Sequence, residues 1–251
     1  MLCWMIILIF GLGYAYLFTF ISDKLYFLPL YLIGGFLISL ILFAIFILIV
    51  IWTAPFTKQN NKLKHKIIYP LVKFVHTILK IKIEVIGREN IPNDTFVVYS
   101  NHKSMLDVTI LYQAYHKILS AIAKNDLVNV PFLSRLMKGL GVVPLDRNND
   151  REGARNILEA IKRVKAGNNY LIFPEGGVKS RETEHMVALR AGAYKLATKP
   201  KAVISPVSII GSSLLSQNCP KKGTKITVVI HKPITPEEYQ GLSTNELGRR
   251  I

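Results

Sequence analysis

Two long, uncharged and strongly apolar runs near the N-terminus place the strongest constraint on how this chain folds. Residues 1–22 carry no charged side chain, and residues 28–52 form a second uncharged run of 25 residues. A helix of about 20 apolar residues is long enough to cross a bilayer. We therefore predict an N-terminal hydrophobic two-helix membrane segment over residues 1–52. Whether the two helices span the bilayer or form a shallow hairpin in one leaflet stays open at this point.

Two other interpretations of the first run fit the sequence less well. A signal peptide has a basic segment before its apolar core and a small-residue cleavage site after it. No basic segment precedes the first run, and no such cleavage site lies between the first run and the second. A helix buried in a soluble core keeps a polar stripe, whereas these runs are apolar on all sides.

The charged residues are confined almost entirely to the rest of the chain. Lys and Arg number 32 against 16 Asp and Glu, which gives a net charge of +16, and Asp23 and Lys24 are the only charged residues in the first 52. The whole positive excess therefore lies on residues 53–251. Such a surface favours an anionic partner, whether lipid headgroups, phosphate substrates or nucleic acid.

The lysines that follow the second apolar run indicate its orientation. Four of them lie between residues 58 and 66, and an excess of Lys and Arg marks the cytoplasmic side of a membrane segment. We predict a location at the cell membrane, with residues 53–251 on the cytoplasmic face.

Residues 57–80 have the pattern of an amphipathic helix. An apolar stripe recurs at steps of three or four residues, and the lysines fall largely outside it. This pattern predicts an interfacial helix at an anionic membrane surface; a helix packed on its own domain is an equal alternative. Pro70 is expected to kink this helix. The stripe comprises Leu63, Ile67, Leu71, Phe74 and Ile78.

From residue 82 onward, short β-branched runs alternate with helical patterns. This alternation is typical of α/β proteins, so we predict an α/β domain over residues 53–251, with a central, mostly parallel or mixed sheet flanked by helices. Such sheets bind ligands beyond the strand ends. The expected strands are 82–87, 95–100, 118–123, 141–146, 170–175, 202–210 and 225–231, and the expected helices lie near 104–115, 131–138, 151–165 and 186–198.

A histidine and an aspartate follow the strand expected at 95–100. His102 and Asp107 are five residues apart, which on one helix is roughly 140° around the axis. They meet only if His102 lies in the turn before the helix, with Ser104 as N-cap and Asp107 at the third helical position. One interpretation is a capping box beside a loop histidine. In the other, Asp107 binds one imidazole nitrogen and leaves the second free as a general base.

Two further motifs lie at the ends of expected strands, and a third lies inside an expected helix. Arg147 is placed to bind phosphate, or to form a surface ion pair with a neighbouring aspartate. Glu175 precedes Gly176 and Gly177, which let backbone amides approach a ligand or simply form a tight turn. Two roles are open for Glu175: orienting acceptor hydroxyls, or holding a basic residue in place. Gly192 is interpreted as a site of close packing.

These motifs, in this order, resemble those of the 1-acylglycerol-3-phosphate acyltransferase family. Residues 101–107, NHKSMLD, are similar to its first motif, and residues 141–147, GVVPLDR, to its second. Residues 173–176, FPEG, match the core of the third, and residues 190–193, RAGA, and 204–207, ISPV, resemble the later blocks. The resemblance spans roughly residues 82–234. It departs after the third motif, where the family's Thr-Arg is replaced, so Lys179 or Arg181 is expected to do that arginine's work.

The resemblance implies a reaction. His102, oriented by Asp107, would activate the sn-2 hydroxyl of lysophosphatidic acid, which would attack an acyl thioester carried by coenzyme A or acyl carrier protein. Membrane phospholipids are the remaining expected partners; no nucleic acid, cofactor or metal is expected. The implied substrate-binding residues are Asn101, Ser104, Arg147, Glu175, Gly176, Gly177, Lys179 and Arg181.

Three alternatives to this reaction stay open at the level of the sequence. The same motifs serve acylation of glycerol-3-phosphate or of another lysophospholipid. A hydrolase or thioesterase would use the same histidine. A membrane-tethered basic binding protein explains the charge but not the His-Asp unit.

Overall fold

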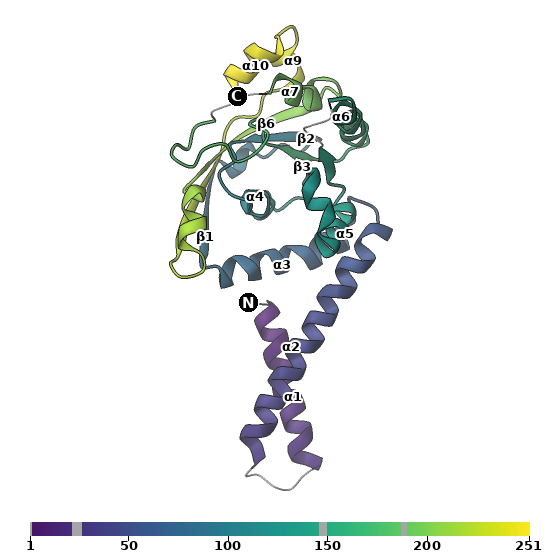
Figure 1. Cartoon of the computed structure of the whole chain (residues 1–251), viewed down its shortest axis with the longest axis vertical. Helices are drawn as coiled ribbons and strands as arrows, with labels where there is room; N and C mark the ends of the chain where they lie inside the picture. The colour runs from purple at the N-terminus through teal and green to yellow at the C-terminus, as the bar shows by residue number, and fades with distance from the viewer. Residues whose placement is uncertain (1, 22–26, 146–149, 187–189) are drawn as a thin grey trace.

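A helical hairpin projects from an α/β body in the computed structural model of this chain (Figure 1). The structure describes residues 2–21, 27–145, 150–186 and 190–251. The hairpin consists of α1 (Leu2–Ile21) and α2 (Leu28–Thr53). It lies on the side of the body that carries α3 (Lys62–Ile78). The predicted division of the chain between residues 52 and 53 stays a prediction.

Small residues bring the two hairpin helices close together. Gly35 lies so near the other helix that a Cβ there would stand 2.5 Å from the Gly11 carbonyl oxygen. In α1 the buried positions Cys3, Ile7, Gly11 and Ala15 recur every four residues, whereas large side chains such as Phe20 on the other faces are exposed. Close approach through small residues is typical of helix pairs in membranes.

The length criterion for a membrane span is met by the second helix. By length and composition, the helical segment Leu28–Phe56 is able to cross a membrane, and only 11% of its most apolar window is buried in the structure. The apolar helix Met5–Ile21 is shorter. Helix α1 as a whole has 20 residues, about the length that a membrane span needs.

The described residues form one sheet of seven strands, in the order β1-β7-β6-β2-β5-β3-β4. All neighbouring pairs are parallel except β6 and β7, which are antiparallel. The predicted α/β class with a mixed sheet is therefore confirmed. The strands are β1 (Ile81–Ile86), β2 (Phe96–Ser100), β3 (Ser120–Lys124), β4 (Val143–Leu145), β5 (Tyr170–Ile172), β6 (Val203–Ile210) and β7 (Thr224–Ile230).

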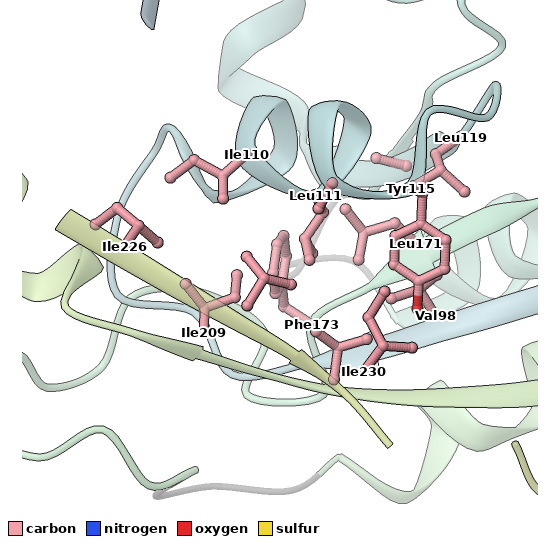
Figure 2. Close-up of a cluster of buried hydrophobic side chains, with 14 of the residues drawn as sticks. Val98, Ile110, Leu111, Tyr115, Leu119, Leu171, Phe173, Ile209, Ile226 and Ile230 are labelled. Carbon is pink, nitrogen blue, oxygen red and sulfur yellow. The ribbon is translucent and has the colours of Figure 1, made fainter. Parts of the chain in front are cut away.

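Two apolar layers cover the sheet, because successive side chains of a strand point to opposite faces. In β2, Phe96 and Val98 belong to one layer, and Val97 and Tyr99 to the other. Figure 2 shows the first layer, which lies between the sheet and α4 (Asp107–Tyr115). The second layer packs under α6 (Asp150–Lys165), α7 (Ala191–Thr198), α9 (Pro236–Tyr239) and α10 (Thr244–Arg250).

The amphipathic helix differs from its prediction at the start. Residues 57–61 are not helical, and α3 begins at Lys62 because the Asn61 side chain caps the amides of Leu63 and Lys64. The predicted apolar stripe is exposed or half-buried, whereas the buried side chains of α3 are Lys64, Ile68 and His76. The helix thus packs on the body through one face and presents its apolar stripe outward, toward the hairpin side.

A close-packed junction joins α2 to the body. A Cβ on Gly139, the last residue of α5 (Pro131–Gly139), would stand 2.5 Å from the Ala54 Cβ. The Arg135 guanidinium stacks over the Trp52 ring at 3.7 Å and donates to the Trp52 carbonyl. The Lys64 ammonium donates to the Gly139 carbonyl. The remaining short helices are η2 (Ala54–Phe56), η3 (Arg88–Asn90), η4 (Asn125–Asn129), η5 (Ser212–Leu214) and α8 (Leu215–Asn218).

Candidate active site

The predicted histidine–aspartate pair forms in the loop that follows β2. His102 Nδ1 lies 3.0 Å from Asp107 Oδ2. The carboxylate is fully buried and the imidazole is 13% exposed. Because a carboxylate only accepts hydrogen bonds, Nδ1 donates and Nε2 of a neutral ring is left as an acceptor. This is the tautomer that a general base requires.

The capping box predicted beside this pair does not form. Helix α4 begins at Asp107 itself, with Leu106 as N-cap, and Ser104 Oγ accepts from the Leu106 amide instead. Asp107 Oδ2 reaches back to the loop, where it accepts from the amides of Lys103 at 2.7 Å and Ser104 at 2.8 Å. Residues 105–106 form a turn, so the helix starts too late for Ser104 to cap it.

Two residues that follow β5 contact His102 directly. The Phe173 ring stacks on the His102 imidazole, with ring centroids 4.0 Å apart and planes at 11°. Glu175 is fully buried, and its Oε1 accepts from the His102 amide at 2.9 Å. Its Oε2 lies 3.4 Å from the ammonium of Lys103. The structure contains the contact with a basic residue that one of the two roles left open for Glu175 requires. The other role, orienting acceptor hydroxyls, stays a prediction.

The two glycines after Glu175 adopt backbone conformations that favour glycine. Gly176 has φ +71° and Gly177 has φ +150°. A Cβ on Gly176 would stand 2.7 Å from Nε of Arg190. This turn therefore lets an exposed arginine lie directly against the backbone next to Glu175.

Gly192, two residues after Arg190, differs from Gly176. A Cβ there would meet nothing within 4 Å, so the interpretation as a close-packing site is wrong. The helix expected at 186–198 also starts later, at Ala191, because Arg190 is extended; residues 187–189 lie outside the described part of the chain.

The other predicted site residues lie around the same loop. Asn101 ties it to β6, since its amide exchanges hydrogen bonds of 2.8 Å with the Ile209 backbone and donates to the Glu184 carbonyl. Arg181 Nε donates to the Lys103 carbonyl, and Lys179 is exposed. Roles in substrate binding stay predictions for these residues. Arg147 lies outside the described residues.

Two residues near the pair were not assigned to the site from the sequence. Lys103 lies inside the NHKSMLD motif without an expected role; lysines are mostly exposed in proteins, whereas this one is fully buried. Arg190 was noted in the RAGA block but given no role. One feature of the sequence points to Lys103: it lies between His102 and Ser104. The five-residue spacing of His102 and Asp107 already requires this loop to be tightly folded if the two side chains are to meet.

Comparison with known proteins places the chain in a class of enzymes. A family model described as Acyltransferase matches residues 82–210, just over half of the chain. The chain belongs to this acyltransferase family, and it is an enzyme. The resemblance that the motifs predicted is therefore confirmed.

The individual relatives agree in their names. A Mycoplasma pneumoniae protein named "Probable 1-acyl-sn-glycerol-3-phosphate acyltransferase" is 28% identical over 205 residues, covering 76% of each chain. A Saccharomyces cerevisiae protein named "1-acyl-sn-glycerol-3-phosphate acyltransferase" is 29% identical over 179 residues, covering 69% of this chain and 58% of its own length. The fold is similar to the crystal structure of the 1-acyl-sn-glycerophosphate (LPA) acyltransferase PlsC from Thermotoga maritima, with TM-score 0.63, 28% identity and 75% coverage of both chains.

Proposed function

We propose that this enzyme transfers a fatty acyl group from an acyl thioester to the sn-2 hydroxyl of lysophosphatidic acid and so forms phosphatidic acid. The observation that carries the proposal is the buried Asp107 carboxylate on His102 Nδ1, which leaves Nε2 as a base. The names of the relatives support lysophosphatidic acid as the acceptor. The acyl donor is coenzyme A or acyl carrier protein.

The reaction is a direct transfer. His102 Nε2 takes the proton of the acceptor hydroxyl as its oxygen attacks the thioester carbonyl. The tetrahedral intermediate collapses, the carbon–sulfur bond breaks, and the imidazolium returns the proton to the leaving thiolate. Asp107 stabilises the imidazolium in between, because its carboxylate is buried and directly hydrogen-bonded to the ring.

Three exposed basic side chains lie on the segment between β5 and α7. Arg181 contacts the loop that carries His102, and Arg190 lies against Gly176. Lys179 is on the same exposed segment. We assign the acceptor's phosphate to this basic rim, together with Arg147, because guanidinium groups bind phosphate through paired hydrogen bonds.

The hairpin anchors the enzyme in the bilayer, with the body on the cytoplasmic face. Support comes from the exposed apolar sides of α1 and α2 and from the lysines that follow α2. Its substrate and product are lipids, so an anchored active site meets both at the membrane surface.

The test is a matrix of donors and acceptors with the purified full-length protein in detergent. Acyl-coenzyme A and acyl carrier protein thioesters are each offered with lysophosphatidic acid, glycerol-3-phosphate and water, and every product is identified. We expect phosphatidic acid to be the main product. Free fatty acid without an acceptor would indicate a thioesterase, and acylated glycerol-3-phosphate would change the acceptor.

Two variants test the residue roles in the same assay. His102→Ala is expected to abolish transfer, and Asp107→Asn to leave a rate lower by about 10²–10⁴-fold, the usual contribution of a positioned general base. Thermal unfolding of both variants controls for loss of the loop that Asp107 holds. Full turnover by folded His102→Ala would remove His102 from the mechanism.

A further inference from the structure

An ion pair lies buried beneath the loop that carries the catalytic histidine. The Lys103 ammonium and the Glu175 carboxylate are 3.4 Å apart, and both side chains have no solvent exposure. The ammonium also donates to the His185 carbonyl at 2.8 Å. Burying two charges is costly unless their geometry is specific. Such a pair in an active-site loop calls for a functional explanation.

Two carboxylates hold three successive backbone amides of this loop. Glu175 accepts from the amide of His102, and Asp107 accepts from the amides of Lys103 and Ser104. The loop is therefore clamped from the β5 side and the α4 side at once. The position of the imidazole depends on both clamps, since its own backbone amide is one of the three.

The same arrangement creates an electrostatic problem for a base. Two negative charges beside His102 favour the protonated ring, and an imidazolium cannot accept the acceptor's proton. The positive charge of Lys103 offsets the negative charge of Glu175. With Lys103 present, the Asp107 carboxylate on Nδ1 steadies the imidazolium during transfer.

We propose that Lys103 is a positioning residue: it neutralises Glu175, so that this carboxylate holds the His102 backbone without driving the imidazole into its protonated form. The catalytic meaning of this assignment rests on the proposed function, but its electrostatic content does not. Among the described residues, the other charges near the loop are Arg181, on the Lys103 carbonyl, and Arg190, at Gly176. Both are exposed, so solvent screens them more strongly than the buried pair.

The test follows the protonation of His102 without requiring turnover. Diethyl pyrocarbonate modifies neutral imidazole, and peptide mass spectrometry reports its rate at His102 as a function of pH in the full-length protein in detergent. Lys103→Met removes a positive charge from beside Glu175, so the reactivity curve is expected to move to higher pH by about one unit. Glu175→Gln leaves Lys103 uncompensated, so the curve is expected to move to lower pH.

Two further variants separate charge from folding. The double variant Lys103→Met with Glu175→Gln removes both charges and is expected to restore the wild-type curve, even if each single variant is less stable. Lys103→Arg keeps the charge and is expected to leave the curve in place. Shifts of both single variants in one direction, or no shift in either, would overturn the proposal, because a merely structural pair gives no opposite shifts.

The acid limb of the acyl-transfer rate, measured on the same variants, is expected to move with the reactivity curve. Failure of the wild-type enzyme to acylate lysophosphatidic acid would remove the proposed function, while the reactivity curves would still decide the role of Lys103.

Discussion

A single glycine lets an arginine lie directly against the turn that follows β5. Gly176 combines a left-handed backbone, φ +71°, with the side chain of Arg190 packed where a Cβ would stand. Asn, Asp or any other residue with a Cβ would have to displace that arginine. The turn after Glu175 is therefore specified both by its backbone conformation and by what lies against it.

Replacement of this glycine provides a sharp test. Gly176→Ala is expected to lower the free energy of unfolding by roughly 1–2 kcal/mol, the cost of left-handed backbone for a residue with a Cβ, and to reduce the acyl-transfer rate as Arg190 moves. Gly192→Ala is the matched control, because a Cβ there meets nothing. The control is expected to stabilise α7 by up to about 0.5 kcal/mol. Equal unfolding free energies in the two variants would contradict this account.

At the scale of elements, a buried histidine joins α3 to α4. His76 is 2% exposed, with Nδ1 2.6 Å from Gln113 Oε1 and Nε2 2.9 Å from Thr109 Oγ1. Burial lowers the pKa of His76 below its ordinary value of 6.5, with a smaller opposing effect from the Gln113 hydrogen bond. The amphipathic helix is thus fixed to the body through a buried histidine whose pKa lies below its ordinary value.

This contact predicts a loss of stability in acid. Below about pH 6.5 the unfolded chain binds a proton at this histidine that the folded chain does not, so the free energy of unfolding falls as the pH falls. The thermal midpoint is expected to drop between about pH 7.5 and about pH 5.5, and to drop less in His76→Gln. His65, whose pKa is also lowered by burial, contributes with the same sign and accounts for part of the remaining slope. An identical pH dependence in His76→Gln would contradict the assignment.

The hairpin offers a test on adjacent residues. Gly35 faces the Gly11 carbonyl, whereas a Cβ on Gly34 would meet nothing within 4 Å. Gly35→Val is expected to separate α1 from α2, and Gly34→Val to leave them packed. The separation is measured by the yield of a short thiol crosslinker between Phe18→Cys and Tyr31→Cys, because these two rings are 5.0 Å apart.

The two native cysteines, Cys3 and Cys219, are replaced by serine in every protein of this series. Equal crosslinking yields in the Gly34 and Gly35 variants would show that the small residues do not set the helix separation.

Most elements were predictable from the sequence because their signals are local. The β-branched runs gave strands within a few residues of those observed, since a buried parallel sheet requires such runs on every strand. The late start of α4 was not predictable, because it depends on Asp107 binding the amides of Lys103 and Ser104. The His102–Asp107 contact followed from the motif, but the buried Lys103–Glu175 pair joins residues 72 apart and appears only when β2 and β5 lie side by side.

For the whole molecule, apolar surface and positive charge are separated along the chain. The hairpin exposes most of its large apolar side chains, and the whole net charge of +16 lies on residues 53–251. If the hairpin anchors the enzyme as proposed, two forces act at the bilayer: hydrophobic insertion, which salt does not weaken, and attraction to anionic headgroups, which salt screens.

These forces differ in their response to salt. We expect the protein to stay in the membrane fraction when cells are extracted at about 1 M NaCl, where the Debye length falls to about 3 Å, and to be released by detergent. Release by salt alone would show that the lysines, and not the hairpin, hold the enzyme to the membrane.

The junction at the end of α2 has a consequence for which lipids the enzyme can use. Ala54 against Gly139 and Trp52 under Arg135 leave little room for bending between the neck and the body. If the proposed function holds, a junction that bends little between α2 and the body keeps His102 at one depth in the leaflet, whatever the local thickness of the headgroup layer. The enzyme would then select acceptor lipids first by the depth of their free hydroxyl in the leaflet, measured from the glycerol backbones of the lipids, and only afterwards by contacts with side chains.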